Sequence, residues 1–415
     1  MANRKKRILI LTADAGYGHR SAANALQEAL LLRYRTSVKV EIINPLDDKR
    51  APMVLRDAQT DYDKWVRKAP ELYKFGYEAS DNPLPTAIAE SALTIGMFEL
   101  MRDLLRTYRP DVVVSTYPLY QPALTGVLAA FKAAIPLITV VTDLATVHRL
   151  WFNSRTDILL VPTEVVRDLA IEAGVDPAHI QITGIPVHPE IVGDVRSRKK
   201  IRAELGWRQD LFTVLAVGSK RVEGLVEALN VANHFGQPLQ LAVVTGNDDE
   251  LYAELKQAEW HNPVHLYKFV KNMPQLMHAA DMIICKAGGL IVTESLACGL
   301  PMMLVNVIPG QETGNAEYVV NNGAGVLTET PVAVLEALAH FTANKQAELK
   351  RTSAAATAIG RPQAAFDAAA IIWETVQVTR AEPDLSYRSN LINLLTLNQI
   401  PWIEGEVLTS GEAEE

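Results

Sequence analysis

The chain has 415 residues, 48% of them hydrophobic and 21% charged, so it can bury the cores of two domains and is not globally disordered. Its net charge of −8 argues against a general nucleic-acid binder, which needs a basic surface for phosphate contacts, so we expect no nucleic acid among its partners. Cys285 and Cys298 are the two cysteines, and we expect free thiols rather than a disulfide, which suits a reducing cytoplasm.

The two segments that could direct the chain to a membrane are its start and an uncharged run in its first third. Residues 1–7 are basic, but the apolar run 8–11 is too short for a signal peptide. The uncharged run 112–131 contains Pro118 and Pro122, so we expect strand, turn and helix rather than a membrane span. The basic start is either solvated or in contact with anionic lipid, and the sequence leaves both open.

A glycine-rich loop follows the first predicted strand and opens a helix. Gly16 and Gly18 fit the start of a dinucleotide fingerprint, but Ser21 stands at its third glycine and Asn44 near the expected ribose-binding acid. His19 lies at the helix start, where the positive end of the helix dipole favours a neutral imidazole that can accept a proton. His19 is therefore either a catalytic base or a histidine that caps or packs.

Alternating apolar runs and helical patterns predict a doubly wound parallel sheet in the first half of the chain. Its strands are expected at 8–12, 38–43, 111–115, 137–141 and 158–161. Asp143 follows the fourth strand and could hold a catalytic imidazole, bind an acceptor hydroxyl or cap a helix. His148 could contact substrate or simply pack.

The segment 48–109 has no strand pattern and is rich in helical and aromatic residues. Trp65, Tyr73, Phe75 and Tyr77 lie among lysines and arginines, a mixture suited to a membrane interface. A helical insertion packed on the sheet explains the same composition, so both interpretations stay open.

The second half repeats the strand and helix pattern, with strands expected at 212–217, 239–245, 264–267, 282–285 and 302–307. Gly288 and Gly289 precede a helix whose free N–H groups suit a phosphate. Glu294 in that helix can accept hydrogen bonds from ribose hydroxyls. Polar side chains also follow the next strand, at its carboxyl end, where open α/β sheets bind ligands: Gln311, Glu312 and Asn315. The alternative to a ligand site is a plain βαβ unit whose glycines only make tight turns.

These motifs resemble one known family. K-x-G-G-(x)4-E-(x)4-G-x-P and P-G-Q-E-x-G-N in the second half, with G-x-G-H-R-x-A-A in the first, are similar to motifs of the monogalactosyldiacylglycerol synthase and processive diacylglycerol glucosyltransferase family. The resemblance covers about residues 7–330, although Tyr17 and Ala287 replace a usual glycine and proline. It implies an α/β chain of GT-B fold, with two Rossmann-like doubly wound domains facing across a cleft.

The resemblance also implies the domain order. We expect an acceptor and membrane-contact domain at 1–190 and a UDP-sugar donor domain at 191–378, whose last helix crosses back to the first. Residues 379–415 form an extension whose acidic end is expected to be disordered.

The resemblance assigns roles to single residues. His19 would be the base, and the 48–109 segment with its four aromatic residues would help to admit the acceptor from the membrane. A substrate contact of His148 is expected from its position in the sequence alone. The donor contacts would be Gly18, Gly218, Phe269, Val270, Gly288, Gly289, Glu294, Gln311, Glu312 and Asn315. For Gly218 a turn role, and for Phe269 and Val270 a core role, are the alternatives.

The function implied is inverting transfer of a hexose, glucose or galactose, from a UDP-sugar to diacylglycerol at an anionic membrane surface. The UDP-sugar is a substrate, so no cofactor is expected, and no metal is expected because no D-x-D site is evident. The protein would be peripherally associated with the inner face of the cell membrane. A GT-B transferase for another acceptor, or a UDP-sugar sensor without turnover, is the alternative.

Overall fold

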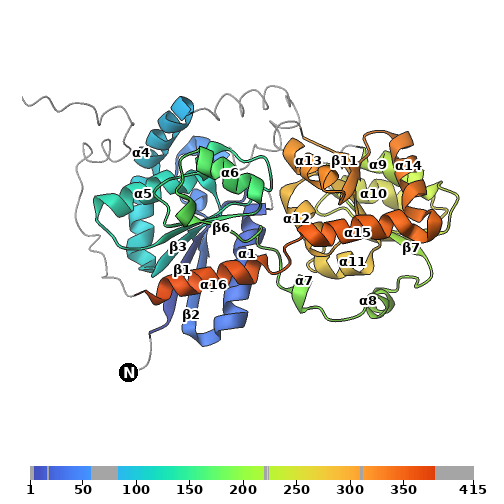
Figure 1. Ribbon diagram of the computed structural model, residues 1–415, viewed down its shortest axis with the longest axis horizontal. Helices are drawn as coiled ribbons and strands as arrows, with labels where there is room; N and C mark the ends of the chain where they lie inside the picture. Colours follow the sequence, from blue (N-terminus) through green and yellow to red (C-terminus); the bar gives the residue numbers. More distant parts are fainter. Residues whose placement is uncertain are drawn as a thin grey trace, which may run out of the picture.

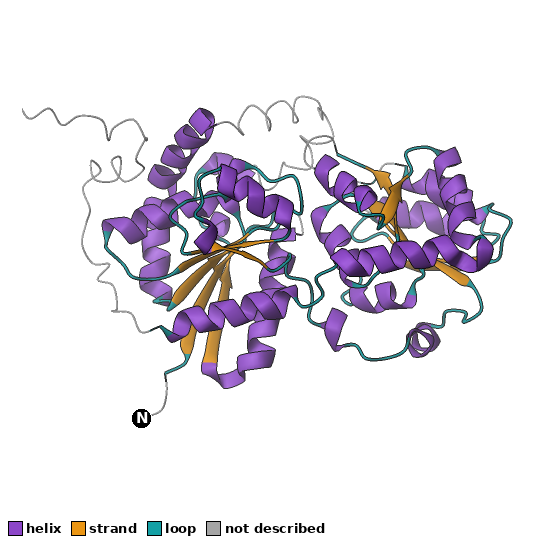
Figure 2. Ribbon diagram, viewed as in Figure 1, coloured by secondary structure: helices purple, strands orange, loops and turns teal. Residues whose placement is uncertain are grey.

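Two parallel six-stranded sheets, each with helices on both faces, form the two lobes of the molecule (Figures 1 and 2). The computed structural model describes residues 4–15, 18–57, 83–218, 222, 224–308 and 312–378. The predicted doubly wound α/β architecture is confirmed.

The first sheet has the strand order β2-β1-β3-β4-β5-β6. Its strands are β1 (Lys6–Leu11), β2 (Val38–Ile43), β3 (Val112–Ser115), β4 (Leu137–Val140), β5 (Ile158–Val161) and β6 (Ile180–Ile182). Its helices are α1 (Gly18–Tyr34), α4 (Pro83–Tyr108), α5 (Gln121–Ala130) and α6 (Glu164–Glu172), and α7 (Glu190–Gly193) follows in the connection to the second lobe.

Strand β1 shows why the sequences of these strands are continuous apolar runs. Ile8 and Ile10 are buried in the cluster that contains α1, whereas Leu9 and Leu11 are buried in the cluster that contains α4 and α5. Both faces of the sheet are covered, so successive side chains must all be apolar.

Helix α4 covers one face of this sheet and packs closely on α5. A Cβ atom at Gly126 would lie 2.9 Å from Cγ2 of Thr94, so the glycine allows the two helices to approach. No helix among the described residues is long and apolar enough to cross a membrane. Trp65, Tyr73, Phe75 and Tyr77 lie outside the described residues.

The second sheet has the order β12-β11-β10-β7-β8-β9. Its strands are β7 (Phe212–Val217), β8 (Leu239–Val244), β9 (Val264–Tyr267), β10 (Met282–Lys286), β11 (Met302–Asn306) and β12 (Gly325–Leu327). Its helices are α8 (Arg198–Leu205), α9 (Leu225–Asn233), α10 (Asp249–Gln257), α11 (Met273–Ala279), α12 (Gly289–Ala297), α13 (Thr313–Asn321), α14 (Pro331–Thr342) and α15 (Ala347–Ile359).

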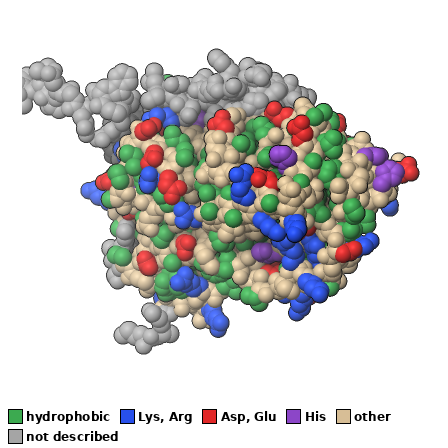
Figure 3. Space-filling view, turned by 45° about the vertical axis from the view of Figure 1, so that its right-hand side comes forward, with side chains coloured by type: hydrophobic (Ala, Val, Ile, Leu, Met, Phe, Trp, Pro, Cys, Tyr) green, Lys and Arg blue, Asp and Glu red, His purple; other side chains and the backbone are tan. Residues whose placement is uncertain are grey.

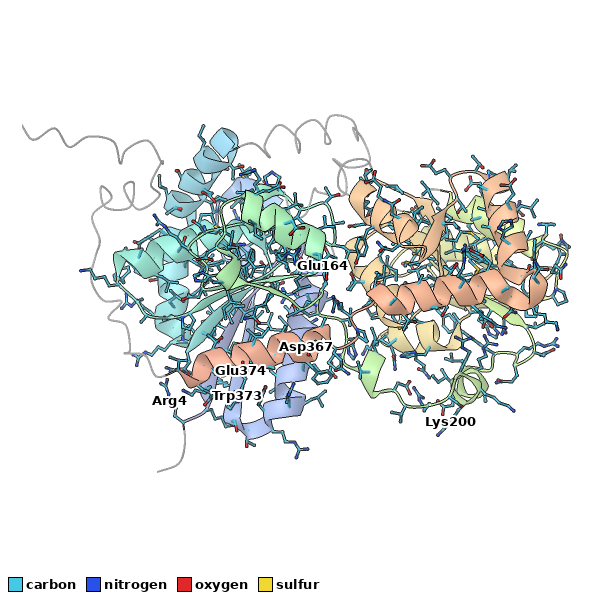
Figure 4. All side chains as sticks on the ribbon, in the orientation of Figure 1. Arg4, Glu164, Lys200, Asp367, Trp373 and Glu374 are labelled. Carbon is cyan, nitrogen blue, oxygen red and sulfur yellow. The ribbon has the colours of Figure 1, made fainter. Side chains whose placement is uncertain are left out.

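The last described helix, α16 (Ala364–Gln377), lies on the first lobe, whereas α15 lies on the second (Figure 1). Trp373 of α16 stacks on Tyr34 of α1 with ring centroids 4.5 Å apart; Figure 4 labels Trp373 on the side of α16 nearer α1. The chain therefore returns to the first lobe after completing the second.

Polar contacts among the described residues join the lobes and their connection. Arg361, just before α16, pairs with Glu164 at 3.3 Å, and His188 Nε2 lies 3.0 Å from a Glu28 oxygen of α1. Gly314 of α13 donates its N–H to the Thr146 hydroxyl at 3.0 Å. The face drawn in Figure 3 carries charges of both signs, with Lys and Arg side chains gathered right of its centre.

The strand orders fix where a ligand site can form. The chain reverses its direction of travel across the first sheet between β1 and β3, and across the second between β7 and β10. Loops that leave adjacent strands in opposite directions open a crevice at the carboxyl ends of such strands. His19 follows β1, and Gly288 and Gly289 follow β10, so both glycine-rich motifs lie at switch points.

Candidate active site

His19 lies in the first turn of α1 and is held by groups that follow β3 and β4. Its Nδ1 atom is 2.7 Å from the Thr142 hydroxyl, and the Thr116 hydroxyl donates to its backbone carbonyl at 3.1 Å. The Tyr117 ring meets the imidazole edge to face, with centroids 5.0 Å apart, and Trp151 lies on another side at 6.0 Å. These contacts leave the ring little rotational freedom.

The surroundings of His19 keep its imidazole neutral. Removal from water lowers the pKa of His19 to about 4, although a hydrogen bond with the Thr116 backbone opposes this change. A neutral ring can take a proton from a hydroxyl at neutral pH. Its role as the base stays a prediction.

Asp143 lies next to the His19 site but binds another partner. Its carboxylate accepts a hydrogen bond from Nε1 of Trp151 at 2.7 Å, while Thr142 holds the His19 ring. Burial raises the pKa of Asp143 to about 6. Asp143 caps no helix in this structure, and a contact with an acceptor hydroxyl stays a prediction.

His148 has a structural role that the geometry shows. Its Nδ1 atom accepts from the N–H of Leu150 at 3.1 Å and caps the short 3-10 helix Arg149–Trp151. This helix carries Trp151, so His148 helps to place the ring beside His19. Direct contact of His148 with substrate stays a prediction.

On the facing lobe, Gly288 and Gly289 connect β10 to α12. A Cβ atom at Gly288 would lie 3.1 Å from the Lys286 side chain and 3.4 Å from a Glu312 oxygen. A Cβ atom at Gly289 would lie 3.5 Å from the backbone carbonyl of Thr142 in the first lobe. Side chains would fill this space, so the glycines leave the start of α12 unobstructed, and a phosphate bound there stays a prediction.

Glu294 is a buried acid without a protein counter-ion in the described structure. It is 8% exposed, and burial raises the pKa of its carboxyl to about 7. A buried carboxyl without a counter-ion is costly to ionise, and this cost is the cause of the raised pKa. The ribose role predicted for Glu294 is compatible with this position.

Glu312, directly before α13, is paired on both of its oxygens. Lys286 donates to Oε1, and the N–H of Ile308 donates to Oε2 at 3.2 Å. The side chain of Glu312 is 5% exposed, so the ion pair fixes its orientation. The partner proposed for it in hexose binding, Gln311, lies outside the described residues.

Asn315 in the first turn of α13 connects the two donor loops. Its amide N–H donates to the carbonyl of Ala287 at 3.0 Å, whereas its buried Oδ1 atom has no protein partner in the described structure. A buried acceptor of this kind is normally satisfied by a ligand or by water. Contact of this oxygen with the sugar donor stays a prediction.

Four other predicted donor residues differ in what the structure shows. A Cβ atom at Gly218 would lie 2.6 Å from Leu225 and 2.9 Å from Leu251, so packing requires this glycine. Val270 packs against the core, whereas Phe269 is 58% exposed and free to stack on a base. Gly18, at the start of α1, has open space around it.

The cysteines are free thiols, as the sequence predicted. Burial raises the pKa of both Cys285 and Cys298 to about 12, so neither is a thiolate at neutral pH. Among the described residues, no group of three or more His, Cys, Asp or Glu side chains could hold a metal ion.

Thr142, Thr146 and Lys286 belong to the site, although sequence reasoning did not select them. Threonines usually pack or cap, and only the distance to His19 reveals what Thr142 does. The sequence could have indicated Lys286 as a site residue, because it stands two residues before Gly288 in the K-x-G-G motif.

The two facing doubly wound lobes define a chain of GT-B fold, and solved structures share this fold. MurG of Acinetobacter baumannii superposes with a TM-score of 0.56 at 15% identity, over 89% of this chain and 100% of that one. Anabaena Alr3699/HepE in complex with UDP-glucose gives 0.53 at 16% identity, over 89% and 99%.

Sequence comparison then gives the family. Residues 19–187 match the monogalactosyldiacylglycerol synthase domain, and 213–367 match the glycosyltransferase family 28 C-terminal domain. Monogalactosyldiacylglycerol synthase 3 of Arabidopsis thaliana is 32% identical over 88% of this chain and 80% of its own length. The Spinacia oleracea synthase is 32% identical over 87% and 71%. The chain belongs to the monogalactosyldiacylglycerol synthase family, and the predicted family is confirmed.

The expected cytoplasmic location at the inner face of the cell membrane is wrong by this comparison. The matched synthases of Arabidopsis, rice and spinach are chloroplastic proteins by name. The expectation depended on free thiols and a basic start. Free thiols fit any reducing compartment, and a basic start fits any anionic membrane surface.

Proposed function

We propose that this enzyme transfers a galactosyl group, with inversion, from UDP-galactose to the hydroxyl of diacylglycerol. The observation that carries the proposal is a neutral, fixed His19 whose partner Thr142 lies beside Gly289 at the start of α12 in the facing lobe. The names of the relatives, monogalactosyldiacylglycerol synthases, support the sugar and the acceptor.

The second lobe offers a separate group for each part of the donor. N–H groups behind Gly288 and Gly289 suit the diphosphate, and the unpaired carboxyl of Glu294 suits the ribose hydroxyls. Glu312, fixed by Lys286, suits the hexose hydroxyls. Phe269 offers an exposed ring for the base.

The reaction then needs one proton acceptor and one leaving-group site. The acceptor oxygen attacks the anomeric carbon from the face opposite UDP, and its proton passes to the free nitrogen of His19. The bond from the anomeric carbon to the diphosphate oxygen breaks, and UDP leaves with the electron pair. Backbone N–H groups at the start of α12 stabilise the developing charge on UDP.

The lipid acceptor would enter beside α4. Met53, Val54 and Ile88 are 67%, 78% and 64% exposed, and Pro52 would lie 3.1 Å from a Cβ atom at Gly96 of α4. Exposed apolar side chains around one helix are suited to an anionic membrane surface that carries diacylglycerol.

The test is turnover with diacylglycerol in anionic and neutral vesicles, with UDP-galactose and UDP-glucose offered separately. We expect monogalactosyldiacylglycerol from the wild type and a loss of about 100-fold or more in kcat for His19→Ala, with unchanged UDP affinity. His340→Ala changes an exposed histidine of α14 and serves as the matched control. UDP release without glycolipid, or full activity in His19→Ala, would contradict the proposal.

A further inference from the structure

We propose that Thr142 is the positioning residue of the His19 base. Its hydroxyl oxygen accepts the hydrogen on Nδ1, so that Nε2 keeps the lone pair that takes the acceptor's proton. This inference rests on the proposed function and deepens it by assigning the tautomer of the base and the residue that holds its Nδ1 atom.

The contact between the two side chains is short and sheltered. His19 Nδ1 and Thr142 Oγ1 are 2.7 Å apart, and Thr142 is 5% exposed. Within the described part of the chain, the Thr142 hydroxyl makes no other hydrogen bond. The imidazole is therefore the protein partner available to this hydroxyl, and water has little access to replace it.

The proton in this contact can lie on either side, and the two arrangements have different chemistry. If the hydroxyl donates to Nδ1, the ring hydrogen lies on Nε2 and the neutral ring cannot take a proton there. If Nδ1–H donates to the hydroxyl oxygen, Nε2 is free to act as the base. Catalysis by His19 through Nε2 requires the second arrangement.

The loop that begins at Thr142 also reaches the donor lobe at two points. The Thr142 carbonyl lies 3.5 Å from the position of a Cβ atom at Gly289, and the Thr146 hydroxyl accepts from the N–H of Gly314 at 3.0 Å. The residue that holds the base thus lies beside the first residue of α12. The position of His19 relative to the anomeric carbon depends on this loop. A small displacement of the ring should lower kcat rather than the affinity for substrate.

Two substitutions separate the hydroxyl from the shape of the side chain. Thr142→Val keeps the branched shape and removes the hydroxyl, and we expect kcat to fall by about 10- to 100-fold, part of the full contribution of a general base. The KM for the UDP-sugar should not change, and Thr142→Ser should recover activity to within about threefold. In a His19→Ala background, Thr142→Val should have no further effect. A Thr142→Val enzyme with wild-type kcat, or a serine variant no better than valine, would overturn the inference.

The tautomer can be measured without turnover. In the ¹⁵N spectrum of histidine-labelled protein, with His19→Ala used to assign the signal among nine histidines, we expect a protonated Nδ1 and an unprotonated Nε2. Thr142→Val should move this signal toward the opposite tautomer. A wild-type ring protonated on Nε2 would refute the positioning role. Protonated Nδ1 in a protein that makes no galactolipid would instead refute the proposed function and leave the Thr142 assignment in place.

Discussion

Replacing Glu294 with glutamine should stabilise the protein and weaken its binding of UDP. In the folded state burial raises the pKa of this carboxyl from 4.5 to about 7. Well below pH 4.5 the group is protonated in both the folded and the unfolded chain, so it carries no penalty. As pH rises toward 7 the unfolded chain loses its proton first, and the free energy of unfolding falls.

The size of this effect follows from the shift in pKa. At about 1.4 kcal/mol for each pKa unit, the wild type loses at most about 3 kcal/mol above pH 7. A glutamine side chain does not ionise, so Glu294→Gln should regain part of this energy. For a domain of this size the gain corresponds to a rise in Tm of at most about 6–12 °C.

The assay is thermal unfolding without ligand at pH 4.5 and pH 8, together with UDP binding by calorimetry. We expect equal Tm values at pH 4.5, a higher Tm for Glu294→Gln at pH 8, and an increase in the Kd for UDP of about tenfold. Glu336→Gln, on the exposed side of α14, controls for the loss of a surface charge. The reasoning is refuted if the Tm difference is the same at both pH values or if UDP binds as in the wild type.

Three other substitutions test separate contacts. Lys286→Met leaves the Glu312 carboxylate without its counter-ion and should weaken UDP-galactose binding by about tenfold, while UDP binding is unchanged. Calorimetry measures both affinities. Equal losses of both would contradict the hexose role of Glu312. Gly218→Ala places a Cβ atom 2.6 Å from Leu225 and should lower the free energy of unfolding by about 1–3 kcal/mol, so an unchanged denaturation midpoint would contradict the packing argument. Gly314→Ala places a Cβ atom 2.3 Å from the Thr146 hydroxyl and should lower kcat by separating the lobes at this contact, whereas the neighbouring exposed Glu317→Gln should not.

The strands and the motif loops could be predicted because their determinants are local. Apolar runs such as 212–217 and 282–285 became β7 and β10 nearly residue for residue, since a strand buried on both faces must be apolar throughout. The free state of both thiols was also predicted. For Asp143 and His148 the sequence allowed several roles, because it gives no distance to the group that each side chain contacts.

The sequence by itself determined the doubly wound class, the positions of both glycine-rich motifs and the family. Only the tertiary structure decided that Thr142, and not Asp143, holds the His19 ring, because the two residues are adjacent in sequence and point to different partners, His19 and Trp151. It also decided the pairing of Lys286 with Glu312, which are 26 residues apart. Burial sets the pKa of His19 and of Glu294, and burial depends on how helices, strands and loops from both lobes pack around each side chain.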